Sequence, residues 1–212
     1  NLSRGLGDVY KRQDLYYFQQ TDNVLHFIIG DVSDKGVPAA LFMAKTITLY
    51  TRALRDKLTP GQTFTMMNDI LAENNDACMF VTALCGTLNL VTGLITMSNA
   101  GHMSPIIKQD AQTKVYDIKG ATALGLMQGI DYPDIEFQLD KESSMFMYTD
   151  GISEAHDTDN RQYSDERLIE LITELAPSNV EQSGKKIIES VDTFASGTEQ
   201  FDDITLLVIH YN

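Results

Sequence analysis

Three short acidic motifs carry the side chains most able to do chemistry. They read GDVSDKG at 30–36, TDG at 149–151 and DDIT at 202–205. Two of them, and arguably all three, adjoin an apolar run typical of a strand, so a fold that gathers these strand ends would gather their carboxylates. Asp31, Asp150 and Asp202 offer oxygen ligands, and no His pair stands at ligand spacing. This donor set suits Mg²⁺ or Mn²⁺ and not zinc.

A carboxylate cluster of this kind predicts a hydrolase for phosphate esters. Two ions held roughly 3.5 to 4 Å apart would lower the pKa of a bridging water and stabilise an in-line displacement at phosphorus. Taken singly, each motif has an ordinary reading as a turn, a helix cap or a solvated loop. The joint pattern favours the metal site, and repulsion between its carboxylates predicts that its folding is partly linked to metal.

Composition narrows the class of protein. A chain of 212 residues with 43% apolar content suits one domain with a substantial core. The net charge of −14 argues against nucleic acid and anionic membrane surfaces as partners. Cys78 and Cys85 lack the spacing of a metal or disulfide motif, so we expect both to be reduced and buried. No apolar run approaches the length of a membrane span, which predicts a soluble, cytoplasmic domain.

Periodicity indicates which elements position the motifs. The run at 24–29 predicts a strand buried on both faces that delivers Asp31. A helix is expected at 38–55, with Ala40, Ala44, Ile47, Thr51 and Leu54 along its inner face, and another at 63–73. Short strands are expected at 79–90, 94–99, 104–108, 114–118, 135–139 and 144–149, helices at 165–176 and 180–194, and a last strand at 204–211.

Helices on either side of a block of strands predict an α+β architecture. Seven or eight strands favour two mostly antiparallel sheets packed face to face with helices outside both, which makes a four-layer αββα sandwich. The opening residues 1–13 show neither strand nor helix periodicity. We interpret them as a non-native or artefactual leader and residues 14–212 as a single domain.

Five ordered blocks resemble the SpoIIE-type, RsbU-like branch of the PPM, or type 2C, metal-dependent serine/threonine protein phosphatases. They are GDVSDKGVPAAL at 30–41, FVTA at 80–83, NAGH at 99–102, YTDGISEA at 148–155 and QFDDITLL at 200–207. Their order and spacing hold over about 14–211. The resemblance implies the αββα fold with two Mn²⁺ or Mg²⁺ ions and hydrolysis of phosphoserine or phosphothreonine by metal-activated water.

The resemblance also implies residue roles. Asp31 would bridge the two ions, the Val32 carbonyl would ligate one, and Asp150 and Asp202 would hold the other. In the family a Gly-Gly-Asp motif precedes this block, and here Lys11-Arg12-Gln13 replaces its glycines. We assign its metal-binding aspartate to Asp14, whose distance from Asp31 is nearly right; Asp8 is the alternative.

Three further residues stand near these motifs. His102 is either a general acid for the leaving oxygen or the partner of a structural hydrogen bond, and we favour the second. Asp34 either orients water or faces solvent, and again we favour the second. Asp203 is expected to support the ligands or simply to begin the last strand.

The branch implies partners as well. Such domains often act in bacterial partner-switching that controls sigma factors, as the C-terminal output of a longer and sometimes membrane-tethered sensor, on a phosphorylated anti-anti-sigma (STAS) protein. The helices at 38–55 and 63–73 are expected to form switch and dimer elements, with a homodimer as one outcome. The altered first motif leaves a second reading, a weak or inactive module that binds a partner. A phosphodiesterase ranks last, because no Gly-rich phosphate loop is present.

Overall fold

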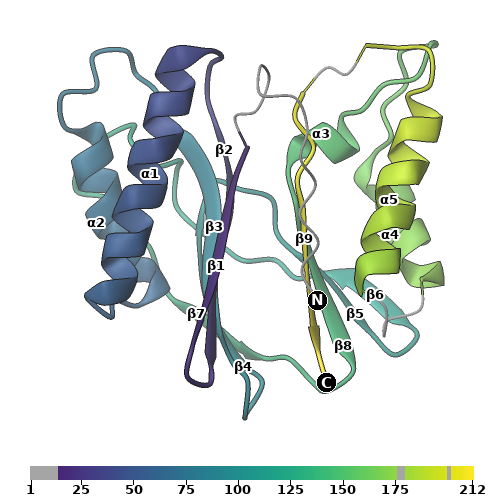
Figure 1. Ribbon diagram of the computed structural model, residues 1–212, viewed down its shortest axis with the longest axis horizontal. Helices are drawn as coiled ribbons and strands as arrows, with labels where there is room; N and C mark the ends of the chain where they lie inside the picture. The colour runs from purple at the N-terminus through teal and green to yellow at the C-terminus, as the bar shows by residue number, and fades with distance from the viewer. Residues whose placement is uncertain (1–13, 176–179, 200–201) are drawn as a thin grey trace.

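The computed structural model describes residues 14–175, 180–199 and 202–212. Two β-sheets lie face to face, and a pair of helices covers the outer face of each (Figure 1). Helices α1 (Val37–Arg55) and α2 (Pro60–Ala72) cover one sheet, while α4 (Asp165–Glu174) and α5 (Val180–Phe194) cover the other. This is the predicted four-layer α+β sandwich.

Antiparallel pairing builds both sheets. The five-stranded sheet has the order β1 (Asp14–Thr21), β2 (Val24–Val32), β3 (Val81–Asn89), β4 (Leu94–Ala100), β7 (Ile135–Gln138). The four-stranded sheet has the order β6 (Gln112–Val115), β5 (Ile106–Gln109), β8 (Ser143–Tyr148), β9 (Leu206–Tyr211). A short helix, α3 (Asp150–Ser153), follows β8 directly.

Apolar side chains fill all three spaces between the layers. Alternation along β2 sends Ile28 toward α1 and α2, while Phe27 and Ile29 point toward the other sheet. Met145 and Met147 of β8 meet them there, and Phe146 between them faces α4 and α5. Strands buried on both faces are therefore central to each sheet, as the dense apolar run at 24–29 predicts.

Strand β1 is the main element absent from the sequence prediction. Its pattern has one buried residue, Leu15, and outward polar or aromatic side chains, because it lies at the edge of its sheet. Helix α2 begins at Pro60 and not at 63, since Thr59 and Gln62 form a reciprocal capping box around its first turn. Ser164 precedes α4 as predicted but makes no side-chain capping hydrogen bond.

The predicted inner face of α1 is right only in part: Ile47 and Leu54 pack against the core, whereas Ala40 and Ala44 are exposed. Its buried residues are Ala39, Phe42, Thr46, Tyr50 and Ala53. The buried Thr46 hydroxyl donates to the Phe42 carbonyl oxygen within the helix, so this polar residue enters the core without an unmet hydrogen bond.

The two cysteines are free thiols, and the expectation that both are buried holds only for Cys85, because Cys78 is exposed. Among the described residues, no helix is both long and apolar enough to cross a membrane.

Candidate active site

Four aspartates from both sheets form what we call the carboxylate cluster: Asp14, Asp31, Asp150 and Asp202. Asp14 opens β1 and lies opposite Asp31 in the register with β2. Asp150 is the first residue of α3, and Asp202 lies shortly before β9. The start of β1, the end of β2, α3 and the approach to β9 lie at one end of the sandwich (Figure 1).

Two glycines allow the backbone to approach closely at this end. A Cβ atom at Gly151 would lie 1.9 Å from the Asp203 carbonyl oxygen, so the segment carrying Asp202 can rest against α3 only if residue 151 has no side chain. A Cβ atom at Gly30 would lie 2.5 Å from the Thr82 carbonyl oxygen. The glycines beside Asp31 and Asp150 therefore have a steric role in bringing the aspartates together.

Burial and repulsion from neighbouring carboxylates raise the pKa values of Asp14, Asp31 and Asp150. Burial raises the pKa of Asp31 to about 8, and the charges of Asp14, Asp150 and Asp202 add to the shift. Burial likewise raises the pKa of Asp14 to about 6, although hydrogen bonds from Thr205 and Thr149 lower it. The pKa of Asp150 is raised by burial and by Asp202. A bound cation would favour the ionised form of these carboxylates, so the cluster is a candidate cation site.

The donors fit a hard divalent ion. The Oδ1 atom of Asp31 is buried and has no hydrogen-bond partner among the described residues. In that same part of the chain, no group of three or more Asp, Glu, His or Cys side chains is already arranged as a metal ligand set. The electrostatic couplings nonetheless show that the four carboxylates are neighbours, and a side-chain hydrogen bond joins Asp14 to Asp31.

The other predicted residues occupy distinct places. Val32 is buried at the last position of β2, so its role as a carbonyl ligand stays a prediction. Asp34 is exposed with a φ of 73° and accepts from the Lys35 amide, in line with a solvent-facing residue. The Asp203 amide donates to Asp202 Oδ1 at 2.9 Å, so Asp203 helps to orient the carboxylate beside it. Asp8 lies outside the described residues.

His102 is built into the fold. Its Nδ1 lies 3.2 Å from Thr82 Oγ1, and its backbone forms two hydrogen bonds with the Asn99 side chain. Burial lowers the pKa of His102 to about 4, although a hydrogen bond with the Tyr148 backbone acts in the opposite direction. The Nε2 atom is buried without a hydrogen bond of normal geometry among the described residues. A histidine that is neutral near pH 7 is a poor general acid, so the geometry favours the structural reading.

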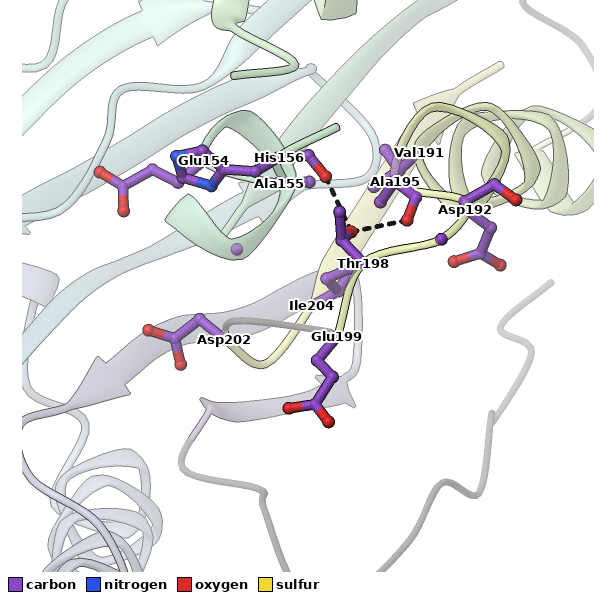
Figure 2. A pocket seen from close by; sticks show the side chains of 13 residues that line it. Glu154, Ala155, His156, Val191, Asp192, Ala195, Thr198, Glu199, Asp202 and Ile204 are labelled. Carbon is purple, nitrogen blue, oxygen red and sulfur yellow. Dashed lines mark hydrogen bonds between the residues drawn. The ribbon is translucent and has the colours of Figure 1, made fainter. Parts of the chain in front are cut away.

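A cavity of about 250 Å³ opens beside Asp202, between α3, α5 and the segment before β9. Figure 2 shows carboxylate side chains around it, together with Thr198, whose hydroxyl contacts the carbonyl oxygens of His156 and Ala195. The acidic residues that line it are Glu154, Asp192, Glu199 and Asp202. Sequence reasoning missed this cavity, because its walls come from segments about 40 residues apart, with no motif to link them.

Sequence reasoning also missed two threonines, although both stand inside the motifs. Thr149 donates to Asp14 Oδ2 at 2.7 Å. The Thr205 hydroxyl also bonds to Asp14. Each acidic motif beside a strand of the four-stranded sheet contains one of these threonines, but nothing in the sequence says which carboxylate its hydroxyl contacts.

Known proteins match this chain over nearly its whole length. The sequence model of the SpoIIE family, Stage II sporulation protein E, matches residues 21–212. Phosphoserine phosphatase RsbU of Bacillus subtilis is 27% identical over 197 residues, which cover 92% of this chain and 58% of RsbU. The chain thus spans little more than half the length of that relative.

Solved structures show the same fold. The SiaA-PP2C domain of Pseudomonas aeruginosa superposes with a TM-score of 0.83 at 18% identity, covering 94% of this chain and 81% of that one. RsbX in complex with magnesium gives a TM-score of 0.68 at 16% identity, covering 96% of this chain and 90% of RsbX. With the carboxylate cluster lying between its two sheets, the chain belongs to the SpoIIE family of PP2C-type phosphatases.

Proposed function

We propose that this domain is a metal-dependent phosphatase that hydrolyses phosphoserine or phosphothreonine on a protein. The observation that carries the proposal is the gathering of four aspartates from two sheets, with an unpartnered Asp31 oxygen, in a chain of the SpoIIE family. Structural ion-pair networks also perturb carboxylate pKa values, but they do so with cationic side chains, and the shifts here arise from burial and other carboxylates.

Each sheet contributes two of the four aspartates to the proposed site. Asp31 would contribute to holding both ions, and the charges of Asp14, Asp150 and Asp202, which raise its pKa, support this assignment. Asp14 would support it from β1, and Asp150 and Asp202 would hold the ion on the other side. When bound, two Mn²⁺ or Mg²⁺ ions would supply activation of a water and neutralisation of the phosphate.

The first test compares hydrolysis of an aryl phosphate and of a phosphoserine peptide with and without Mn²⁺. We expect Mn²⁺-dependent turnover that falls more than about 100-fold in Asp150→Asn, since even residues that only support a metal ligand change activity 10–100-fold. Asp56→Asn is the matched control, because Asp56 is an exposed aspartate that pairs with Arg52 at the C-terminal end of α1.

A negative result has a defined meaning. If the folded chain shows no turnover, the same assay on a version whose first thirteen residues are replaced by a family-like opening strand decides between the two readings. Turnover restored in that version would support the proposal that the domain is a phosphatase. Absence of turnover there contradicts it and favours the binding module.

For the substrate and the partners, we propose a phosphorylated STAS-type regulator in partner-switching control of a sigma factor, with an upstream sensor domain and a homodimer of this chain. Support comes from the likeness to RsbU and from α1, where Val37 and Leu41 are 73% and 67% exposed. Exposed apolar residues on one helix suit contact with another domain. Leu41→Lys should alter activation by an upstream domain while basal aryl phosphate hydrolysis persists; unchanged activation would contradict this.

A further inference from the structure

We infer that Thr149 is a positioning residue: from the opposite sheet, it holds the Asp14 carboxylate in the metal site. Thr205 is a second residue that supports the same carboxylate. The inference rests on the proposed function. It concerns how the Asp14 carboxylate is fixed, given that Asp14 begins strand β1, which pairs on one side only among the described residues.

The hydrogen bonds of Thr149 determine where its hydroxyl proton points. The hydroxyl oxygen accepts from the Thr205 amide at 3.0 Å, and the Thr149 amide donates to the Thr205 carbonyl oxygen at 3.1 Å. The Asp14 carboxylate lies 2.7 Å from the hydroxyl and the Asp203 carbonyl oxygen 3.5 Å from it. A hydroxyl has one proton, so the shorter, charge-assisted bond to Asp14 takes it.

The position of Thr149 makes this bond informative. Thr149 is the residue before α3, where a threonine side chain usually caps the helix, yet it makes no side-chain capping hydrogen bond. The residue is fully buried, so its hydroxyl has no water as an alternative partner. The Thr149 side chain therefore does not cap α3 and instead donates a hydrogen bond to a carboxylate 135 residues away in the sequence.

The consequence for Asp14 is a fixed orientation. The two hydroxyls hold its carboxylate between β1 and the residues that follow β8 and precede β9, opposite Asp31 in the strand register and near the charges of Asp203 and Asp202. Residues that orient a metal ligand in this way set metal affinity without touching the metal. The pair also joins the two sheets at the site, where the apolar packing between them ends.

The experiment measures Mn²⁺ binding by calorimetry on the folded chain. Thr149→Val keeps the shape and removes the hydroxyl, and we expect it to weaken Mn²⁺ binding about 10–100-fold. Thr149→Ser, which retains the hydroxyl, should keep most of the affinity, and Thr205→Val should weaken it. Thr46→Val is the matched control, because Thr46 is equally buried but bonds only within α1.

A double-substitution cycle tests whether Thr149 acts through Asp14. In the Asp14→Ala background, Thr149→Val should weaken Mn²⁺ binding little further, and the two substitutions should also be non-additive in urea unfolding without metal. Equal Mn²⁺ affinity in Thr149→Val and the unsubstituted chain, or full additivity in both measurements, overturns this inference alone. An unsubstituted folded chain that binds no Mn²⁺ overturns the proposed function instead, and the metal-free cycle still decides whether the contact is real.

Discussion

The two sheets supply their aspartates in different ways. Asp14 and Asp31 belong to paired strands and face one another in register, so their backbones are fixed by the sheet. Asp150 and Asp202 lie just outside β8 and β9, and Asp202 borders an open cavity. The strand-borne pair has its pKa values raised to about 6 and 8. We call the first pair the rigid half of the site, because strand pairing fixes its backbone, and the second pair the adjustable half, because its residues lie outside the paired strands.

The largest expected effect tests the rigid half. Asp31→Asn should abolish metal-dependent hydrolysis, by more than about 100-fold, because it removes the carboxylate that the other three surround. The same change should raise the free energy of unfolding in metal-free buffer, since an amide in that place is not charged. Asp150→Asn should lose activity equally but gain less stability. Equal gains measured by urea unfolding would contradict the contrast between the two halves.

Gly151→Ala comes next and tests the adjustable half. The added Cβ would lie 1.9 Å from the Asp203 carbonyl oxygen, so the segment carrying Asp202 must move away from Asp150. We expect about 10–100-fold lower activity and weaker Mn²⁺ binding, with about 1–3 kcal/mol lost in stability. Gly184→Ala is the control, because a Cβ there meets nothing within 4 Å. Wild-type kinetics in Gly151→Ala would show that the spacing of this half is not critical.

The pH dependence of stability should separate the halves further. The pKa of Asp31 rises from 3.8 to about 8 on folding, so between these values the folded state retains a proton that the unfolded chain has lost. The stability of the metal-free protein, relative to Asp31→Asn, should therefore fall as pH rises from about 4 to 8. Mn²⁺ replaces the proton and should reverse this trend. Urea unfolding at several pH values with EDTA or Mn²⁺ measures both; a flat difference in EDTA would refute the shift.

The smallest effect concerns the cavity. Asp192 is exposed and lines the cavity, and its charge is not among those that raise the pKa values of Asp14, Asp31 or Asp150. Asp192→Asn should change aryl phosphate hydrolysis by less than about twofold, as expected of a surface substitution. A larger loss in steady-state kinetics would extend the adjustable half of the site into the cavity.

Sequence alone predicts most of the fold, for reasons that differ between elements. Strands buried on both faces leave dense apolar runs, and hairpin turns such as that around Gly93 leave turn residues, so the middle of the chain was readable. The bounds of helix α1 were predicted correctly but its inner face only in part, because Val37 and Leu41 are apolar and exposed while Thr46 is polar and buried. Edge strand β1 was missed because it has a single buried residue, and one buried residue does not show the alternation typical of a strand.

The features of the site were also predictable only in part from the sequence. The aspartates were found because their motifs are local, and the structure brings Asp14, Asp31, Asp150 and Asp202 together, while their roles as ligands stay a prediction. The contact of Thr149 with Asp14 spans the two sheets. Pairings of that kind depend on how the sheets pack, and a single sequence holds no periodic signal for them.

The interleaving of the two sheets along the chain has a consequence for biosynthesis. β1 and β2 enter one sheet, β5 and β6 the other, β7 returns to the first, and β8 and β9 complete the second. Asp14 is made early, whereas Asp202 and Thr205 emerge only with the last strand. A ribosome-bound chain that lacks β9 therefore has neither a finished sheet nor a finished site, and we expect the enzyme to gain activity only after β9 has left the exit tunnel.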